Sequence, residues 1–118
     1  MDFKKISKNA KKAIAKANET DGIIFCNISL WKIAMLIKKK RLIIDIPYFE
    51  FIKLLKASNK YIFQDLTPEI AGLSVDLPSE INPDPADRII CATSILSKSP
   101  LVTADKNLRK AKSVKTIW

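Results

Sequence analysis

Apolar positions along the chain follow two spacings, one typical of an amphipathic helix and one typical of a buried strand. After Ser7, a favoured helix N-cap residue, four small or apolar residues keep the i, i+3, i+4, i+7 spacing of one buried helix face. They are Ala10, Ala13, Ile14 and Ala17. Gly22 ends this segment, and the continuously apolar run at 23–26 predicts a short strand that is buried on both faces.

The same alternation continues to the end of the chain. Further helices are expected to begin near Ser29, Pro47, Thr67, Pro85 and Lys106. Further strands are expected at 61–63, 100–103 and 114–117. We therefore predict a single α/β domain over residues 1–118, with a mostly parallel sheet flanked by helices. Ligands of such sheets bind at the carboxyl ends of the strands.

Composition places the chain among soluble proteins. Hydrophobic residues make up 47% of the 118 residues, enough for a core, and no apolar run approaches the roughly 18–20 residues that a membrane span needs. The N-terminus has no apolar segment of the signal-peptide kind. We therefore expect a cytoplasmic protein, in which Cys26 and Cys91 are reduced thiols buried among apolar neighbours.

The charge balance favours a polyanionic partner. The net charge is +9, and lysines gather in three segments, at 4–16, 38–41 and 106–115. Nucleic acid is the first partner that this indicates and an acidic protein the second, although a lysine-rich genome would produce the same excess without any binding function. The candidate nucleic-acid contacts are Lys38, Lys39, Arg41 and Arg88.

Hydrolytic chemistry in this chain has to depend on carboxylates. The sequence has no His, which removes the commonest general base, and no clustered Cys, which argues against zinc. Asp87 and Asp105 are placed to face one cleft at the sheet edge, where paired carboxylates repel unless Mg²⁺ or Mn²⁺ lies between them. Each has a structural alternative, because Asp87 suits a capping box and Asp105 suits the N-cap of a short helix. Asp84 is a further candidate that could equally cap the helix beginning at Pro85.

Five segments form an ordered set of motifs: S-L-W-K-I-A-M at 29–35, R-L at 41–42, L-T-P-E-I-A at 66–71, D-P-A-D-R-I-I-C-A-T at 84–93 and P-L-V-T-A-D at 100–105. In this order they resemble the motifs of VapC-type PIN domains, the toxins of bacterial toxin–antitoxin pairs. The resemblance covers nearly the whole chain. It implies a sheet of about five parallel strands flanked by helices, and a Mg²⁺-dependent endoribonuclease held inactive by a small antitoxin.

The resemblance also implies roles for individual residues. Members of that family collect acidic side chains from four places, of which the third matches Asp87 and the fourth matches Asp105. Asp84 matches an additional Asp of the subgroup. Lys32 stands where the family has the Glu of S-x-W-E, so one ligand position is lost. Lys40 stands where the family usually has Gly at a helix end, and a left-handed Lys costs roughly 1 kcal/mol.

The family's first acidic residue lies on an opening strand, and this sequence starts after that point. We therefore expect a PIN-like domain without its first, central strand. The preferred interpretation is a VapC-like homologue whose cleavage is impaired. A non-catalytic module that binds RNA or an antitoxin is the alternative, and an active nuclease using Asp84, Asp87 and Asp105 is the third. A homodimer is compatible with all three.

Overall fold

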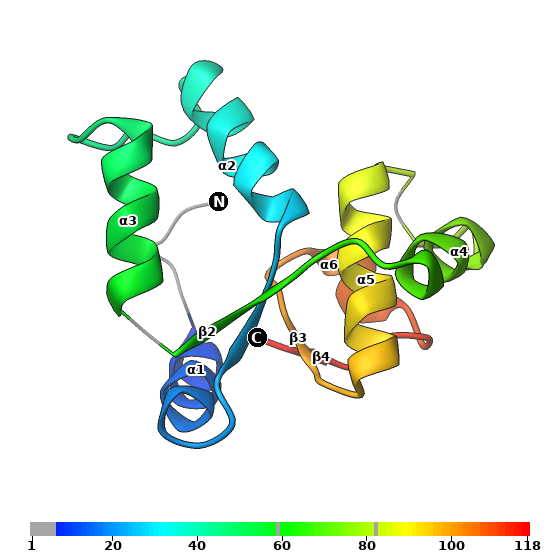
Figure 1. Cartoon of the computed structure of the whole chain (residues 1–118). Helices are drawn as coiled ribbons and strands as arrows, with labels where there is room; N and C mark the ends of the chain where they lie inside the picture. Colours follow the sequence, from blue (N-terminus) through cyan, green and yellow to red (C-terminus); the bar gives the residue numbers. More distant parts are fainter. Residues whose placement is uncertain (1–6, 59, 82) are drawn as a thin grey trace.

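Helices and short strands alternate along the chain, as Figure 1 shows for the computed structural model, which describes residues 7–58, 60–81 and 83–118. The helices are α1 Lys8–Glu19, α2 Ile28–Lys38, α3 Tyr48–Ser58, α4 Pro68–Asp76, α5 Pro85–Ser97 and α6 Lys106–Lys110. The strands are β1 Ile23–Cys26, β2 Tyr61–Gln64, β3 Leu101–Val102 and β4 Thr116–Ile117. The predicted order of elements is therefore confirmed.

Capping residues start the helices where the sequence indicates. The Ser7 hydroxyl accepts a hydrogen bond from the Ala10 N–H at 3.1 Å at the start of α1. At the start of α4 the Thr67 hydroxyl accepts from the Ile70 N–H, also at 3.1 Å. Each bond satisfies one of the N–H groups that the first helical turn leaves without an intrahelical partner.

The strands pair in parallel, which confirms the α/β class with a parallel sheet. β1 pairs with β2 from Ile23 opposite Tyr61, and β3 pairs with β4 from Leu101 opposite Thr116. Within the described residues these are two separate two-stranded sheets rather than one continuous sheet. The expected absence of an opening strand stays a prediction.

The expectation that β1 is buried on both faces is wrong. Only Cys26 is buried in this strand, while Ile23, Ile24 and Phe25 are partly exposed. The reason is that β1 pairs only with β2 among the described strands, and a strand at a sheet edge is less covered than a central one.

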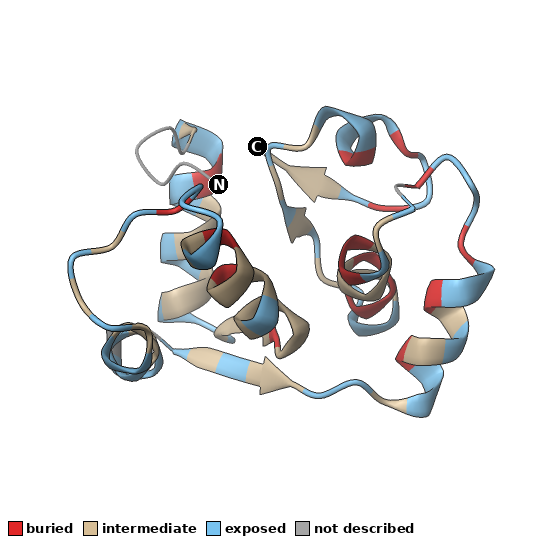
Figure 2. Cartoon of the chain, turned by 90° about the horizontal axis from the view of Figure 1, so that it is seen from above, coloured by how far each residue is buried: buried red, intermediate tan, exposed pale blue. Residues whose placement is uncertain are grey.

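Two hydrophobic clusters lie on the two sides of the molecule. One joins α4, α5, α6 and the segment before β4, and is centred on Ile81 and Cys91, both fully buried. The other joins α2 to the segment after it through Ile33, Leu36 and Leu42. Figure 2 shows the same division, with buried residues gathered along α5 and its neighbours and along α2. Contacts between α2 and α5 connect the two sides.

Three described residues have a positive φ, and one of them, Lys98 with φ 54°, ends α5. Gly22 has φ 95°, and a Cβ atom there would lie 2.8 Å from the Lys60 carbonyl oxygen, so the turn into β1 needs glycine. Lys40 has φ 58°, which confirms the left-handed conformation expected at the end of α2.

Both cysteines are free and buried, as the sequence predicts. The pKa of the Cys26 thiol is raised above its ordinary value, mainly by burial. A hydrogen bond between the Cys26 and Thr93 side chains links β1 to α5 and offsets part of this shift. Among the residues that the structure describes, no helix is both long and apolar enough to cross a membrane.

Candidate functional site

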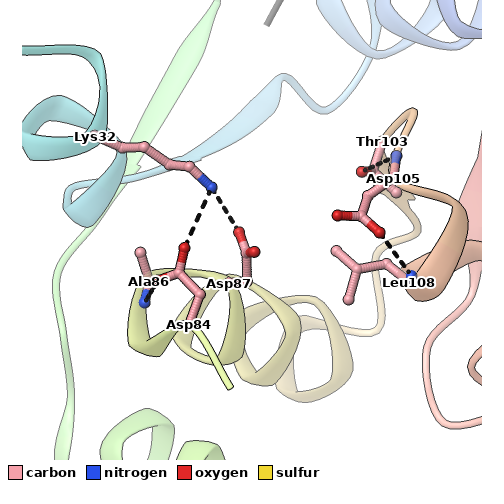
Figure 3. Close-up of polar contacts among 7 residues, drawn as sticks. All are labelled: Lys32, Asp84, Ala86, Asp87, Thr103, Asp105 and Leu108. Atoms are coloured by element: carbon pink, nitrogen blue, oxygen red, sulfur yellow. Dashed lines mark hydrogen bonds and ion pairs between the residues drawn. The ribbon is translucent and has the colours of Figure 1, made fainter. Parts of the chain in front are cut away.

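The sequence-predicted Lys32 and two of the predicted carboxylates meet between α2 and α5. The Lys32 Nζ atom donates to Asp87 Oδ1 at 2.7 Å and lies 3.9 Å from Asp84 Oδ2 (Figure 3). The Asp87 side chain is 12% exposed and that of Lys32 is 30% exposed. A short, largely buried ion pair therefore stands at the predicted site.

The local structure explains why these groups converge. β1 ends at Cys26, and α2 begins two residues later, so its first turns lie beside the carboxyl end of that strand. Asp84 is the N-cap of α5 and accepts from the Ala86 N–H at 2.9 Å, as its structural interpretation requires. Asp87 follows in the first turn of α5, where the positive end of the helix dipole stabilises a carboxylate.

Within the described residues, both ion pairs use the same ammonium group, that of Lys32. Each of them runs from α2 to α5, so each connects the two sides of the molecule. The chain has many more cationic than acidic side chains, and most of its lysines lie at the surface. The position of Lys32 is therefore a specific feature of this site rather than a result of general abundance.

Asp105 has the structural role that the sequence left open. Its carboxylate accepts from the N–H groups of Asn107 at 2.8 Å and Leu108 at 3.2 Å, which caps α6. Its own N–H donates to the Thr103 hydroxyl at 3.1 Å. Figure 3 draws the bonds of Asp105 with Leu108 and Thr103 together with the Lys32 pair.

Asp87 and Asp105 act on a common neighbour. Burial, as the largest cause, and the Asp87 and Asp105 carboxylates together raise the pKa of the Cys91 thiol to about 11, while Arg88 acts in the opposite direction. Both carboxylates therefore lie around one thiol on α5. That they share a single catalytic site stays a prediction.

The described residues do not fit a divalent cation as they are arranged. Mg²⁺ requires several oxygen ligands in near-octahedral order. No group of three or more His, Cys, Asp or Glu side chains within the described ranges is placed to hold a metal ion. One of the two Asp87 carboxylate oxygens, Oδ1, already accepts from the Lys32 ammonium.

Arg88 has a structural role that its assignment to nucleic-acid binding overlooked. Its guanidinium donates to the backbone carbonyls of Ser74 at 2.9 Å, Leu77 at 2.5 Å and Ile81 at 3.1 Å. Weaker bonds at 3.4 Å reach the carbonyls of Val75 and Pro78. The side chain thus holds the end of α4 and the following turn against α5, while its candidate contact with RNA stays a prediction.

The other candidate RNA contacts lie at the surface. Lys38, Lys39 and Arg41 are exposed at the end of α2 and in the turn that follows. Lys38 is six residues beyond Lys32, roughly 9 Å along the helix axis. The cluster is therefore separate from the buried ion pair, although the same helix carries both.

One feature near this site was not predicted from the sequence. A cavity of about 250 Å³ lies where α2 and α5 approach the carboxyl ends of β1 and β2. Polar residues that directly follow the two strands line it, together with Trp31. The available signal was the presence of Asn27 and Asp65 immediately after apolar runs, at the edge where ligands of parallel sheets bind.

Comparison with known proteins gives a consistent result. The sequence model described as the PIN domain matches residues 3–114. Ribonuclease VapC22 of Mycobacterium tuberculosis (strain ATCC 25618 / H37Rv) is 33% identical over 116 residues, which cover 97% of this chain and 85% of that protein. No solved structure matches.

Proposed function

Since the chain belongs to the PIN-domain family and is of the VapC type, we propose that it is a VapC-like ribonuclease homologue whose cleavage of RNA is impaired. The single observation that carries the impairment is the 2.7 Å bond from the Lys32 ammonium to the Asp87 carboxylate. The ammonium provides a positive charge where a metal-dependent nuclease needs a negative one. It also takes a ligand oxygen that a metal would need.

The proposal assigns Asp87 and Asp105 to the catalytic and metal-binding positions, with Asp84 as a further metal ligand. The motif order supports these assignments. Mg²⁺ or Mn²⁺ would bind weakly if at all, because a divalent cation must displace or repel the Lys32 ammonium before it reaches Asp87. In this arrangement the Asp84 and Asp87 carboxylates pair with the Lys32 ammonium, which impairs the activation of water by a metal ion at the site.

RNA is the proposed partner, and a small antitoxin is the proposed second partner. The net charge of +9 and the exposed group Lys38, Lys39 and Arg41 support binding to phosphates. The proposal also includes a single PIN-like domain, a cytoplasmic location and a possible homodimer.

A non-catalytic binding module remains the second candidate. The observation in its favour is that Asp84 and Asp105 each make the bonds of a helix N-cap, which gives them a structural reason to be present without any catalysis. An active nuclease based on these three Asp residues is the third candidate. The same experiment separates all three.

The test is cleavage of a fluorescently end-labelled RNA by the whole chain, with Mg²⁺ or Mn²⁺ and with EDTA. We expect little or no metal-dependent product from the natural sequence. The same assay is run on Lys32→Glu, which replaces the ammonium by a carboxylate. Its matched control is Lys38→Glu, because that variant makes the same charge change on the same helix at an exposed position. Robust cleavage by the natural chain that Asp87→Asn abolishes would reject impairment and establish the active nuclease. RNA binding without cleavage in every variant, Lys32→Glu included, favours the binding module.

A further inference from the structure

The cavity beside the ion pair has the form of a small ligand site. It lies at the carboxyl ends of the parallel strands β1 and β2, between the start of α2 and the middle of α5. Its volume of about 250 Å³ is below the roughly 300–1,000 Å³ of pockets that take drug-sized ligands, so it suits one ring system. The floor contains Cys26, Ile89 and Thr93.

An aromatic platform borders this cavity. Trp31 is 57% exposed although its neighbours on α2, Ile33 and Leu36, are buried. Leu66, also 57% exposed, borders the cavity as well. A flat indole with its surface open to solvent is suited to stacking on another planar ring.

Polar groups gather on the strand side of the cavity. The Asn27 side-chain amide donates to the Asp65 carboxylate, and the Gln64 amide donates to the Asp65 backbone carbonyl at 3.1 Å. Both bonds use amide N–H groups as donors. Each amide uses one of its two N–H groups in these bonds, so this side can offer a ligand the amide and carboxylate oxygens as acceptors and the remaining amide N–H groups as donors.

We propose that this cavity binds one nucleobase of single-stranded RNA, with the Trp31 ring stacked on the base. The oxygens of Asn27, Gln64 and Asp65 accept the N–H groups on the base edge. The proposal rests on RNA being the partner, as the proposed function has it, and not on whether the RNA is cleaved. The cavity is lined by the acidic Asp65, which does not attract the RNA backbone. That attraction comes from the chain's net charge of +9.

The position of the cavity connects it to the ion pair. Trp31 immediately precedes Lys32 on α2, and Ile89 follows Asp87 by two residues on α5. A base held on Trp31 is therefore bound by the same two helices that carry the ion pair.

The test follows Trp31 fluorescence in the whole chain carrying Trp118→Phe, which leaves Trp31 as the one tryptophan. The probe is a single-stranded oligoribonucleotide of about six nucleotides. The comparison probe is an abasic oligomer, which has the same length and charge but no bases. We expect saturable quenching by the RNA, and no quenching by the abasic oligomer although it still binds at low salt. Equal quenching by both oligomers would overturn the base site.

Variants give a second, independent readout. Trp31→Ala should weaken RNA binding roughly 5- to 100-fold, which is the range for losing one stacked base, whereas Trp31→Phe should retain most of the affinity. Phe49→Ala is the matched control, because Phe49 is an aromatic residue that is 79% exposed on α3 and does not line the cavity. Equal affinities for Trp31→Ala and Phe49→Ala would reject the proposal.

The two proposals fail in different ways. Efficient RNA cleavage would reject impairment and leave the base site untouched. RNA binding that does not involve Trp31 would reject the base site and leave impairment untouched. If a bound antitoxin changes the Trp31 fluorescence and RNA does not, the cavity is a protein-binding site and the proposal of a base is wrong.

Discussion

Lys32 and Asp87 are 55 residues apart in sequence and form a bond of 2.7 Å between α2 and α5. Asp87 is 9% exposed as a residue, so its carboxylate has little water to replace a lost partner. The pair combines a positive charge and a structural link at the position where a metal-dependent relative would concentrate negative charge. The first two predictions test these two roles.

Lys32→Met should destabilise the fold. Loss of the ammonium leaves a nearly buried carboxylate without its counter-charge, and we expect a loss of about 2 kcal/mol, between the values for exposed and fully buried pairs. Urea unfolding measures the change. Lys38→Met, at an exposed position of α2, should stay within about 0.5 kcal/mol of the natural chain. Equal stability of the two variants would show that the pair does not contribute.

Lys32→Glu should make the stability of the fold depend on a divalent cation. The substitution places a third carboxylate beside Asp84 and Asp87, and a bound divalent cation relieves their repulsion. Thermal unfolding with Mg²⁺ and with EDTA should therefore differ for this variant and coincide for the natural chain. A melting temperature of Lys32→Glu that is identical in both solutions would contradict the prediction, whatever its nuclease activity.

Replacing Arg88 by Lys should weaken the fold and leave RNA binding unchanged. A Lys side chain cannot bridge the carbonyls of Ser74, Leu77 and Ile81 at once, and we expect a loss of about 2 kcal/mol. Urea unfolding reports the loss, and an RNA titration under folding conditions reports the affinity. A stable variant with reduced RNA affinity would instead support Arg88 as an RNA contact.

RNA binding should be sensitive to salt, with little sequence preference. Each contact with a single-strand phosphate contributes roughly 0.7 to the slope of log affinity against log salt concentration. Replacing Lys38, Lys39 and Arg41 by Gln should lower the magnitude of that slope by up to about 2, as measured by fluorescence anisotropy over a salt series. Slopes that coincide would show that this exposed cluster makes no phosphate contact.

Stability should fall as the pH rises from about 9 to about 11. The pKa of the Cys91 thiol is raised from 9.0 to about 11 in the folded chain, mainly by burial, so over this range the unfolded chain loses its proton first and is favoured. The stability that the protonated Cys91 thiol contributes is fully present below pH 9, and it is lost as the pH rises through the folded-state pKa of about 11. Cys91→Ala should flatten this part of the dependence of unfolding free energy on pH, and an unchanged slope in that variant would exclude the thiol as its cause.

Local structure could be derived from the sequence because the interactions that specify it span only a few residues. Ser7, Thr67, Asp84 and Asp105 each bond an N–H group two or three positions further along the chain. A helix was expected to begin near Thr67, Ser7 was expected as an N-cap, and capping was one of the two roles considered for Asp84 and Asp105. The left-handed Lys40 was expected on the motif resemblance, and the α/β order followed from the alternation of apolar spacings. The same resemblance brought Lys32 and Asp87 to one site.

Other features depended on contacts between segments far apart in sequence, which no local pattern encodes. The burial of β1 was overestimated, because the apolar run does not reveal that the strand has a neighbour on one side only among the described strands. The structural role of Arg88 could not be foreseen, because only the packing of α4 on α5 places several backbone carbonyls around its guanidinium. Trp31 has the helical spacing of a core residue, yet the approach of α2 to α5 leaves it at the rim of a cavity. The chain's own residues determined which elements form, and their packing in three dimensions determined which side chains meet, because burial and hydrogen-bond partners are set by neighbours that are distant along the chain.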